Sequence, residues 1–263
     1  MFRALTPIVK NLLMITVGMH VIASFFLPQL KGLFALYYIE SKFFMPFQFV
    51  TYMFMHADFW HLLSNMFGLF VFGPLLEQFL GPKKLLILWM VCGVGSGVLY
   101  SGYTAYNMGK LNDKIEAFTA DPDPEEFNRF VSSNSHLFNT GIYDFIDEYS
   151  RDGDNPELQE RAKRNMLGVR DIQANIPMVG ASGALFGILI AFGMLFPNTQ
   201  LFLLFPPIPI RAKYLVLFYG LYTVYNIFVS NPTDNVAHFA HLSGLLIGAV
   251  LVTYWKKDRQ NFY

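Results

Sequence analysis

Serine, histidine and asparagine side chains that could act together occur near one end of separate apolar segments. Ser182 opens one segment, within Gly180-Ala181-Ser182-Gly183, and His241 lies near the start of another. A serine hydroxyl becomes a nucleophile when a neighbouring histidine accepts its proton, so this pair could perform acyl transfer as a catalytic dyad. A serine between glycines is, on its own, more typical of close helix packing. The presence of further polar residues at the same level favours catalysis.

A third apolar segment carries His61 and Asn65, which are four residues apart and therefore share one face of a helix. Acyl transfer needs N–H donors directed at the developing oxyanion. These two side chains could supply them, together with the backbone N–H of Ser182 at a helix start, where amides lack partners within the helix. Glu77 falls near the opposite end of its segment, and no other carboxylate is placed to orient His241. The sequence therefore predicts a dyad rather than a triad.

Glycines predict how the segments bearing Ser182 and His241 would meet. Gly183 and Gly187 form a small-xxx-small face, and Gly244 and Gly248 follow His241 along one stripe of its helix. Two parallel helices packed through these faces would place the serine beside the histidine.

The elements that position these residues are predicted to be membrane helices. The chain is 54% hydrophobic and only 14% charged, against roughly 25% charged residues in an average soluble domain. A helix needs about 20 apolar residues to cross a bilayer. Six stretches approach that length, at 11–27, 59–80, 84–106, 182–200, 213–230 and 236–255. We therefore predict an all-α, polytopic membrane protein with six transmembrane helices.

The charge and cysteine content exclude several classes of function. The 19 basic residues balance the 19 acidic ones, so no net field would recruit nucleic acid. Cys92 is the one cysteine of the chain, which excludes disulfide stapling and cysteine-based zinc sites. No cofactor is predicted, and the sequence carries no signal for an oligomeric state.

Basic residues in the short connections predict the orientation. Nine of them fall on the side that holds both termini: Arg3, Lys10, Lys83, Lys84, Arg211, Lys213, Lys256, Lys257 and Arg259. Because such residues favour the cytoplasmic side, the termini are predicted to be cytoplasmic. The second, fourth and sixth spans then all begin at the outer surface, which puts the proposed site residues at one depth.

The stretch 106–171 interrupts the membrane pattern with 14 of the 19 acidic residues. The predicted organisation is a membrane core over 1–105, an extracytoplasmic polar insertion over 106–175 and a second part of the core over 176–263. Asn155 before Pro156 reads as a helix N-cap. Apolar residues recur at helical spacing, at Met108, Leu111, Ile115, Phe118, Leu158, Ala162, Met166 and Val169. Short amphipathic helices are favoured over a disordered loop, and we expect this insertion to lie beside the catalytic opening and modulate substrate access.

The segment His56-Ala57-Asp58-Phe59-Trp60-His61-Leu62-Leu63-Ser64-Asn65, the motif around Ser182 and Ala240-His241-Leu242-Ser243-Gly244 resemble the rhomboid family of intramembrane serine proteases. They occur in the family order within a six-span core. The resemblance implies Ser182 as nucleophile, His241 as base, and His61 and Asn65 as oxyanion contributors. It also implies that membrane-anchored proteins are the substrates, that no metal is used, and that Glu77 before Gly81 is structural.

Two features depart from the family pattern. Phe47-Gln48 stands where many members have a tryptophan-arginine pair in the first loop, and the long insertion lacks a counterpart in the minimal bacterial form. A bacterial inner membrane is the expected location, since no Arg- and Ser-rich transit peptide precedes the first span.

Two rival functions use the same residues differently. A metal-dependent membrane hydrolase could use histidines as ligands, namely His56, His61, His238 and His241, but the sequence lacks a His-Glu-x-x-His pattern. A non-catalytic relative that binds membrane proteins would typically lose the serine or the histidine, and both are present.

Overall fold

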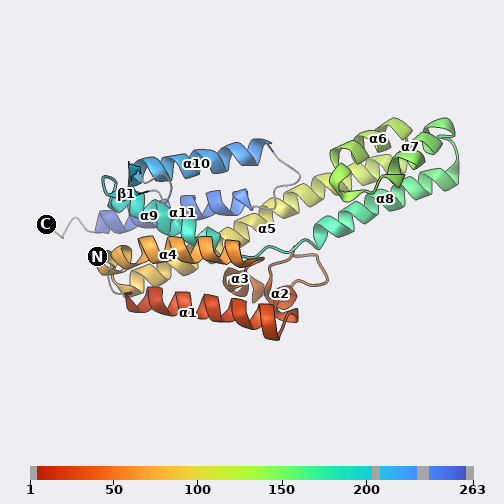
Figure 1. Ribbon diagram of the computed structural model, residues 1–263. Coiled ribbons are helices and arrows are strands. Elements are labelled where there is room, and N and C mark those ends of the chain that lie inside the picture. The colour runs from red at the N-terminus through yellow and green to blue at the C-terminus, as the bar shows by residue number, and fades with distance from the viewer. Residues whose placement is uncertain (1–4, 203–207, 230–236, 259–263) are drawn as a thin grey trace.

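The computed structural model describes residues 5–202, 208–229 and 237–258, and these are mainly helical (Figure 1). A bundle of long helices forms one half of the molecule, and shorter helices project from one end of it. The bundle contains α1 (Pro7–Val21), α4 (Phe59–Leu80), α5 (Pro82–Ala120), α9 (Ser182–Leu195), α10 (Ala212–Val229) and α11 (His238–Asp258). The projecting part contains the end of α5, α6 (Pro124–Ser133), α7 (Gly141–Arg151) and α8 (Pro156–Ala174).

Short elements connect these helices. A π-helix at Ile22–Phe26 ends α1, and α2 (Gln29–Phe34), α3 (Gln48–Thr51) and a 3-10 helix (Tyr52–Phe54) lie in the first loop. A further 3-10 helix, η3 (Ser135–Leu137), follows α6. After α9, β1 (Gln200–Phe202) pairs antiparallel with β2 (Pro209–Arg211), with Leu201 opposite Ile210.

Five described helices are long and apolar enough to cross a membrane: α1 with its π-helical end, α4, α5, α10 and α11. The predicted spans 11–27, 59–80, 213–230 and 236–255 agree with four of them to within a few residues. The third predicted span, 84–106, is only part of α5, which continues unbroken to Ala120. The predicted outer connection 230–235 lies outside the described residues.

The fourth predicted span, 182–200, is too long. α9 ends at Leu195 after 14 residues, which at 1.5 Å per residue is roughly 21 Å, less than the ~30 Å hydrocarbon core. α9 packs against α4, α5, α10 and α11. Because protein rather than lipid surrounds most of α9, its length is not set by the bilayer.

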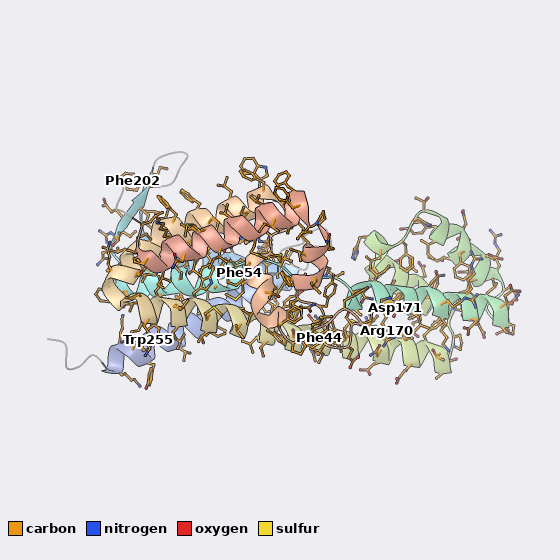
Figure 2. All side chains as sticks on the ribbon, turned by 90° about the horizontal axis from the view of Figure 1, so that it is seen from below. Phe44, Phe54, Arg170, Asp171, Phe202 and Trp255 are labelled. Carbon is orange, nitrogen blue, oxygen red and sulfur yellow. The ribbon has the colours of Figure 1, made fainter. Side chains whose placement is uncertain are left out.

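The two ends of the bundle differ in charge. The start of α1, the α4–α5 junction, the start of α10 and the end of α11 lie together, away from the projecting helices (Figure 1). In Figure 2, Phe202 and Trp255 mark this end. Basic residues gather there, at Lys10, Lys83, Lys84, Lys213, Lys256 and Lys257. This is the end for which the sequence predicts a cytoplasmic location.

Glu77 joins the first two long helices at that end. Its carboxylate, 3% exposed, accepts hydrogen bonds from the backbone N–H groups of Ile8 and Val9, each 3.0 Å long. These amides open α1 and have no partner within the helix. The carboxylate also complements the positive end of the helix dipole, which is a structural role.

The projecting helices enclose a core of their own. The apolar residues that recur at helical spacing in the sequence are buried in this core: Met108, Leu111, Ile115, Phe118, Leu158, Ala162, Met166 and Val169. They share the core with aromatic residues of α6 and α7, namely Phe127, Phe145 and Tyr149. The side chain of Asn155 caps α8 by accepting from the N–H of Glu157. The insertion is thus a packed helical unit.

Gln48, the second residue of the Phe47-Gln48 pair, anchors the first loop. It is completely buried. Its side-chain amide donates to the carbonyls of Leu33 (3.0 Å) and Phe43 (2.9 Å), and its oxygen accepts from the N–H of Tyr37 (3.4 Å). A neutral amide therefore ties three parts of the loop together without a buried charge.

Candidate active site

The helices that carry Ser182 and His241 touch through their glycine faces, as the sequence predicts. A Cβ added to Gly244 of α11 would collide with the backbone carbonyl of Gly183 of α9. A Cβ on Gly248 would lie 2.8 Å from the carbonyl oxygen of Gly187. Only glycine allows the two backbones to come this close.

The His241 ring lies on the face of α9 that begins with Ser182. It stacks on the ring of Phe186, with centroids 4.3 Å apart and planes 11° apart. Phe186 is four residues after Ser182, so the two side chains share one helix face. The structure thus brings the predicted nucleophile and base to one surface of α9, at the helix start.

His61 reaches this site from α4. A Cβ added to Gly180 would lie 2.7 Å from His61 Nε2 and 3.8 Å from Ser182 Oγ, so these two atoms flank the same point. Gly180 has φ +122°, a conformation that L side chains rarely adopt. A glycine at position 180 therefore allows both the backbone turn before α9 and the close approach of the His61 imidazole.

Asn65 lies one turn further along α4 and is 3% exposed. Its side-chain nitrogen donates to the carbonyl of His61 at 2.8 Å, which leaves the second N–H of the amide for another acceptor. All four predicted site residues therefore come from α4, α9 and α11, at the end of the bundle that faces the projecting helices (Figure 1).

The segment that leads into Ser182 is tied to the first loop by an isolated β-bridge. Met178 and Leu36 of the first loop exchange two backbone hydrogen bonds, of 2.8 and 2.9 Å. The N–H of Gly180 donates to the carbonyl of Tyr52 at 3.0 Å. The first loop thereby fixes the approach to the nucleophile.

His56 lies behind His61. The two rings meet edge to face with centroids 5.0 Å apart, and His20 of α1 lies 6.5 Å from His56 on the other side. His56 is 1% exposed. Burial lowers the pKa of His56 to about 3, with smaller contributions from His61 and His20, against which Asp58 acts. The His56 ring is therefore neutral across the physiological range.

This neutral histidine predicts an acid-sensitive fold. Below about pH 6.5, the pKa of histidine in an unfolded chain, His56 is protonated in the unfolded protein. In the folded protein it stays neutral until the pH falls to about 3. Stability should therefore fall by about 1.4 kcal/mol per pH unit over this window. We expect unfolding in detergent between pH 6 and pH 4 to approach this slope, and His56→Gln to reduce it. His136→Gln, at an exposed histidine, is the control; equal slopes for both variants would contradict the assignment.

The other histidines do not gather as metal ligands. His238 is 9% exposed, with its ring 6.0 Å from that of His241 and 5.9 Å from that of Tyr222. Within residues 5–202, 208–229 and 237–258, no three His, Cys, Asp or Glu side chains converge as a metal would require. The histidines named by the metal-hydrolase interpretation thus do not form one ligand set.

Two contributors to the site were not predicted from the sequence. Phe186 supports the His241 ring, and Leu36 forms a β-bridge with Met178, before Ser182. The i, i+4 spacing of Ser182 and Phe186 could have indicated the first. The second is a pairing between residues 142 positions apart, for which the local sequence carries no signal.

This arrangement defines an all-α polytopic membrane protein whose helix bundle brings a serine and a histidine to one face of α9. The family model described as the rhomboid domain matches residues 44–116 and 161–257, more than half of the chain. The chain belongs to the rhomboid family. The stretch between the two matched segments, 117–160, covers the end of α5, α6, α7 and the start of α8.

Two relatives come from Arabidopsis thaliana. "RHOMBOID-like protein 12, mitochondrial" is 25% identical over 213 residues, which are 81% of this chain and 47% of that protein. "Rhomboid-like protein 11, chloroplastic" is 35% identical over 88 residues, or 34% of this chain and 30% of that protein. The chain thus spans about half of one relative and less than a third of the other.

The protein is an integral membrane protein. The predicted bacterial inner membrane finds no support in these relatives, whose names place them in a mitochondrion and a chloroplast. The physical reason is that hydropathy and Lys/Arg bias define spans and orientation, and neither property identifies which membrane is crossed.

Proposed function

We propose that this protein is an intramembrane serine endopeptidase that hydrolyses peptide bonds in or near the transmembrane segments of membrane-anchored proteins. The stacking of His241 on Phe186, one turn from Ser182 and across touching glycine faces, is the observation that supports it best. Membership of the rhomboid family agrees with this reaction.

In this mechanism His241 accepts the proton of the Ser182 hydroxyl as the oxygen attacks the scissile carbonyl. The negative charge that develops on the carbonyl oxygen is met by N–H donors from His61, Asn65 and the backbone of Ser182. The protonated histidine then gives its proton to the leaving amine. Water, activated by the same histidine, hydrolyses the acyl-enzyme and restores the serine.

Serine labelling tests the proposal directly. A fluorophosphonate probe should label wild-type protein at Ser182, and the purified protein in detergent should cut a transmembrane reporter in the presence of a metal chelator. Labelling with no cleavage of any reporter would favour a non-catalytic binding role. Cleavage that the chelator abolishes would favour the metal-hydrolase alternative.

The oxyanion donors give a graded prediction. Removal of one such donor costs on the order of 10²–10³ in rate, so His61→Ala and Asn65→Ala should each lower kcat by about that factor. KM should change less, because the donors act on charge that exists only in the transition state. Ser64→Ala, at a neighbouring exposed serine of α4, is the matched control. Unchanged kcat in both variants would mean that α4 supports the fold but supplies no oxyanion donor.

The insertion is proposed to lie outside the cytoplasm, beside the catalytic opening. α8 ends at Ala174, and the chain runs from there through the β-bridge at Met178 to Ser182. The basic residues lie at the opposite end of the bundle, as expected for a cytoplasmic side. Juxtamembrane segments of substrates would then meet the insertion before they reach the dyad.

A further inference from the structure

A cavity lies at the seam between the insertion and the membrane bundle. Its volume is about 220 Å³, which exceeds the roughly 150 Å³ of a cavity able to hold benzene. Four parts of the chain line it: the first loop at 36–38, α5 between Tyr100 and Met108, η3, and the end of α8 with Ile176. The dyad residues are not among its lining.

The cavity borders the segment around Met178 that leads to the nucleophile. Leu36 lines it and also pairs with Met178. Tyr103 lines it as well and stacks on Phe239, two residues before His241, with ring centroids 4.5 Å apart. A substrate segment that reaches Ser182 from outside would therefore pass close to the seam.

The insertion and the first loop build this seam together. Tyr38 of the first loop is buried in the core of the insertion. The Ser41 hydroxyl donates to the side-chain oxygen of Asn175 at 2.7 Å. In Figure 2, Phe44 of the first loop lies at the end of the bundle nearest to Arg170 and Asp171 of α8. The walls are thus fixed by packing rather than formed by a mobile loop.

The chemistry of the lining suits a cation. Four tyrosines line the cavity, Tyr37, Tyr38, Tyr100 and Tyr103, and aromatic faces attract ammonium and guanidinium groups. Polar groups of Ser101, Thr104, Asn107 and Gln173 also line the cavity, together with His136 and four apolar side chains, and the described lining includes no lysine or arginine.

The insertion, which forms part of the cavity wall, is acidic as a whole. The stretch 106–171 carries 14 acidic and 8 basic residues, a net charge of −6. The pKa of Tyr38 is raised, mainly because the side chain is buried and to a smaller extent because of the negative charge of Glu40. Arg170 is a nearby cation, but it is paired with Asp171 at 3.7 Å and donates to Asn112 at 2.9 Å. A positive guest would therefore meet a favourable field.

We infer that this seam cavity is a specificity site that takes one basic side chain, lysine or arginine, from the outer juxtamembrane segment of the substrate. The inference rests on the proposed proteolysis. In this proposal the insertion selects substrates through a defined binding cavity. It does not act only as a general cover over the opening.

The test uses single-span reporters that differ only in one arginine, moved through the ten residues on the outer side of the cut. At one position or two adjacent positions, arginine should raise kcat/KM over glutamine by roughly 2- to 30-fold, the range expected for a cation on aromatic faces. Glutamate there should lower it. The gain should shrink as salt is added.

Charge variants at Asn107 locate the effect. Asn107 lines the cavity and is exposed, so a charged residue there should leave the fold intact. Asn107→Lys should abolish the arginine preference and Asn107→Asp should increase it. Asn128→Lys, on an exposed site of α6 that does not line the cavity, changes the net charge equally and should preserve the preference.

Several outcomes would overturn this inference without affecting the proposed protease. In the first, no position gives the arginine reporter a higher kcat/KM than the glutamine reporter. In the second, Asn128→Lys and Asn107→Lys lose the arginine preference equally. In the third, a phenylalanine reporter is preferred whatever the charge at residue 107. The first excludes the site, the second indicates a general field, and the third indicates an apolar guest. Failure to cleave any reporter, together with no labelling of Ser182, would instead overturn the proposed function itself.

Discussion

Ser182→Ala should abolish cleavage of a transmembrane reporter while the protein stays folded. The change removes one hydroxyl group from a half-buried position at the start of α9, so little packing is lost. Removal of the nucleophile of a serine protease lowers kcat by roughly 10⁶-fold, far below detection. His241→Ala should be equally inactive. Product formation by purified protein and the melting temperature in detergent are the two measurements.

A neighbouring serine controls for the loss of a hydroxyl. Ser243 lies two residues after His241, is 2% exposed and donates to the carbonyl of Phe239 within its own helix at 2.7 Å. Ser243→Ala should keep activity, since that carbonyl already belongs to the helix ladder. Cleavage by Ser182→Ala protein above a mock preparation would refute the assignment of the nucleophile.

Gly244→Val should inactivate the protein by a different route. A Cβ at this position collides with the backbone of Gly183, and backbone cannot move aside as the end of a flexible side chain can. α9 and α11 must therefore separate. Displacement of about 1 Å can cost 10² in rate, and overpacking costs typically 1–3 kcal/mol of stability. Activity and melting temperature should fall together.

Two other glycines serve as controls for this prediction. Gly102 of α5 has no atom within 4 Å of an added Cβ, so Gly102→Val should be nearly silent. A Cβ on Gly95 would meet the terminal Cδ1 of Ile247, a flexible end, so Gly95→Ala should cost less than Gly244→Ala. Full activity of Gly244→Val would mean that this contact does not set the position of His241.

The sequence predicted the helices that cross the membrane better than it predicted where helices end. Hydropathy identified all of the long spans, because lipid demands an unbroken apolar run. It could not show that α9 stops at Leu195, since the apolar run continues into Phe196 and Pro197 beyond the helix. It also could not show that α5 runs on to Ala120, because a polar helix can continue an apolar one.

The candidate site residues could be proposed from the sequence because polar groups inside spans are rare and therefore conspicuous. The glycine faces followed from spacing alone. The supports of the site were not predictable in the same way. The pairing of Leu36 with Met178, the burial of Gln48 and the docking of Tyr38 in the insertion join distant parts of the chain. Each depends on the finished fold rather than on local sequence.

The unbroken course of α5 has a consequence for how this chain can evolve. One helix carries both the bundle contacts around Cys92 and Ser96 and the insertion contacts from Met108 to Phe118. One residue added between these stretches would rotate the insertion by about 100° and raise it by ~1.5 Å. Tyr38 would then face the wrong side of the insertion core. The number of residues in α5 between Ser101 and Met108 is therefore constrained by the helical repeat. We expect this stretch to change by substitution, or by insertion of whole helical turns together with a matching insertion in α8.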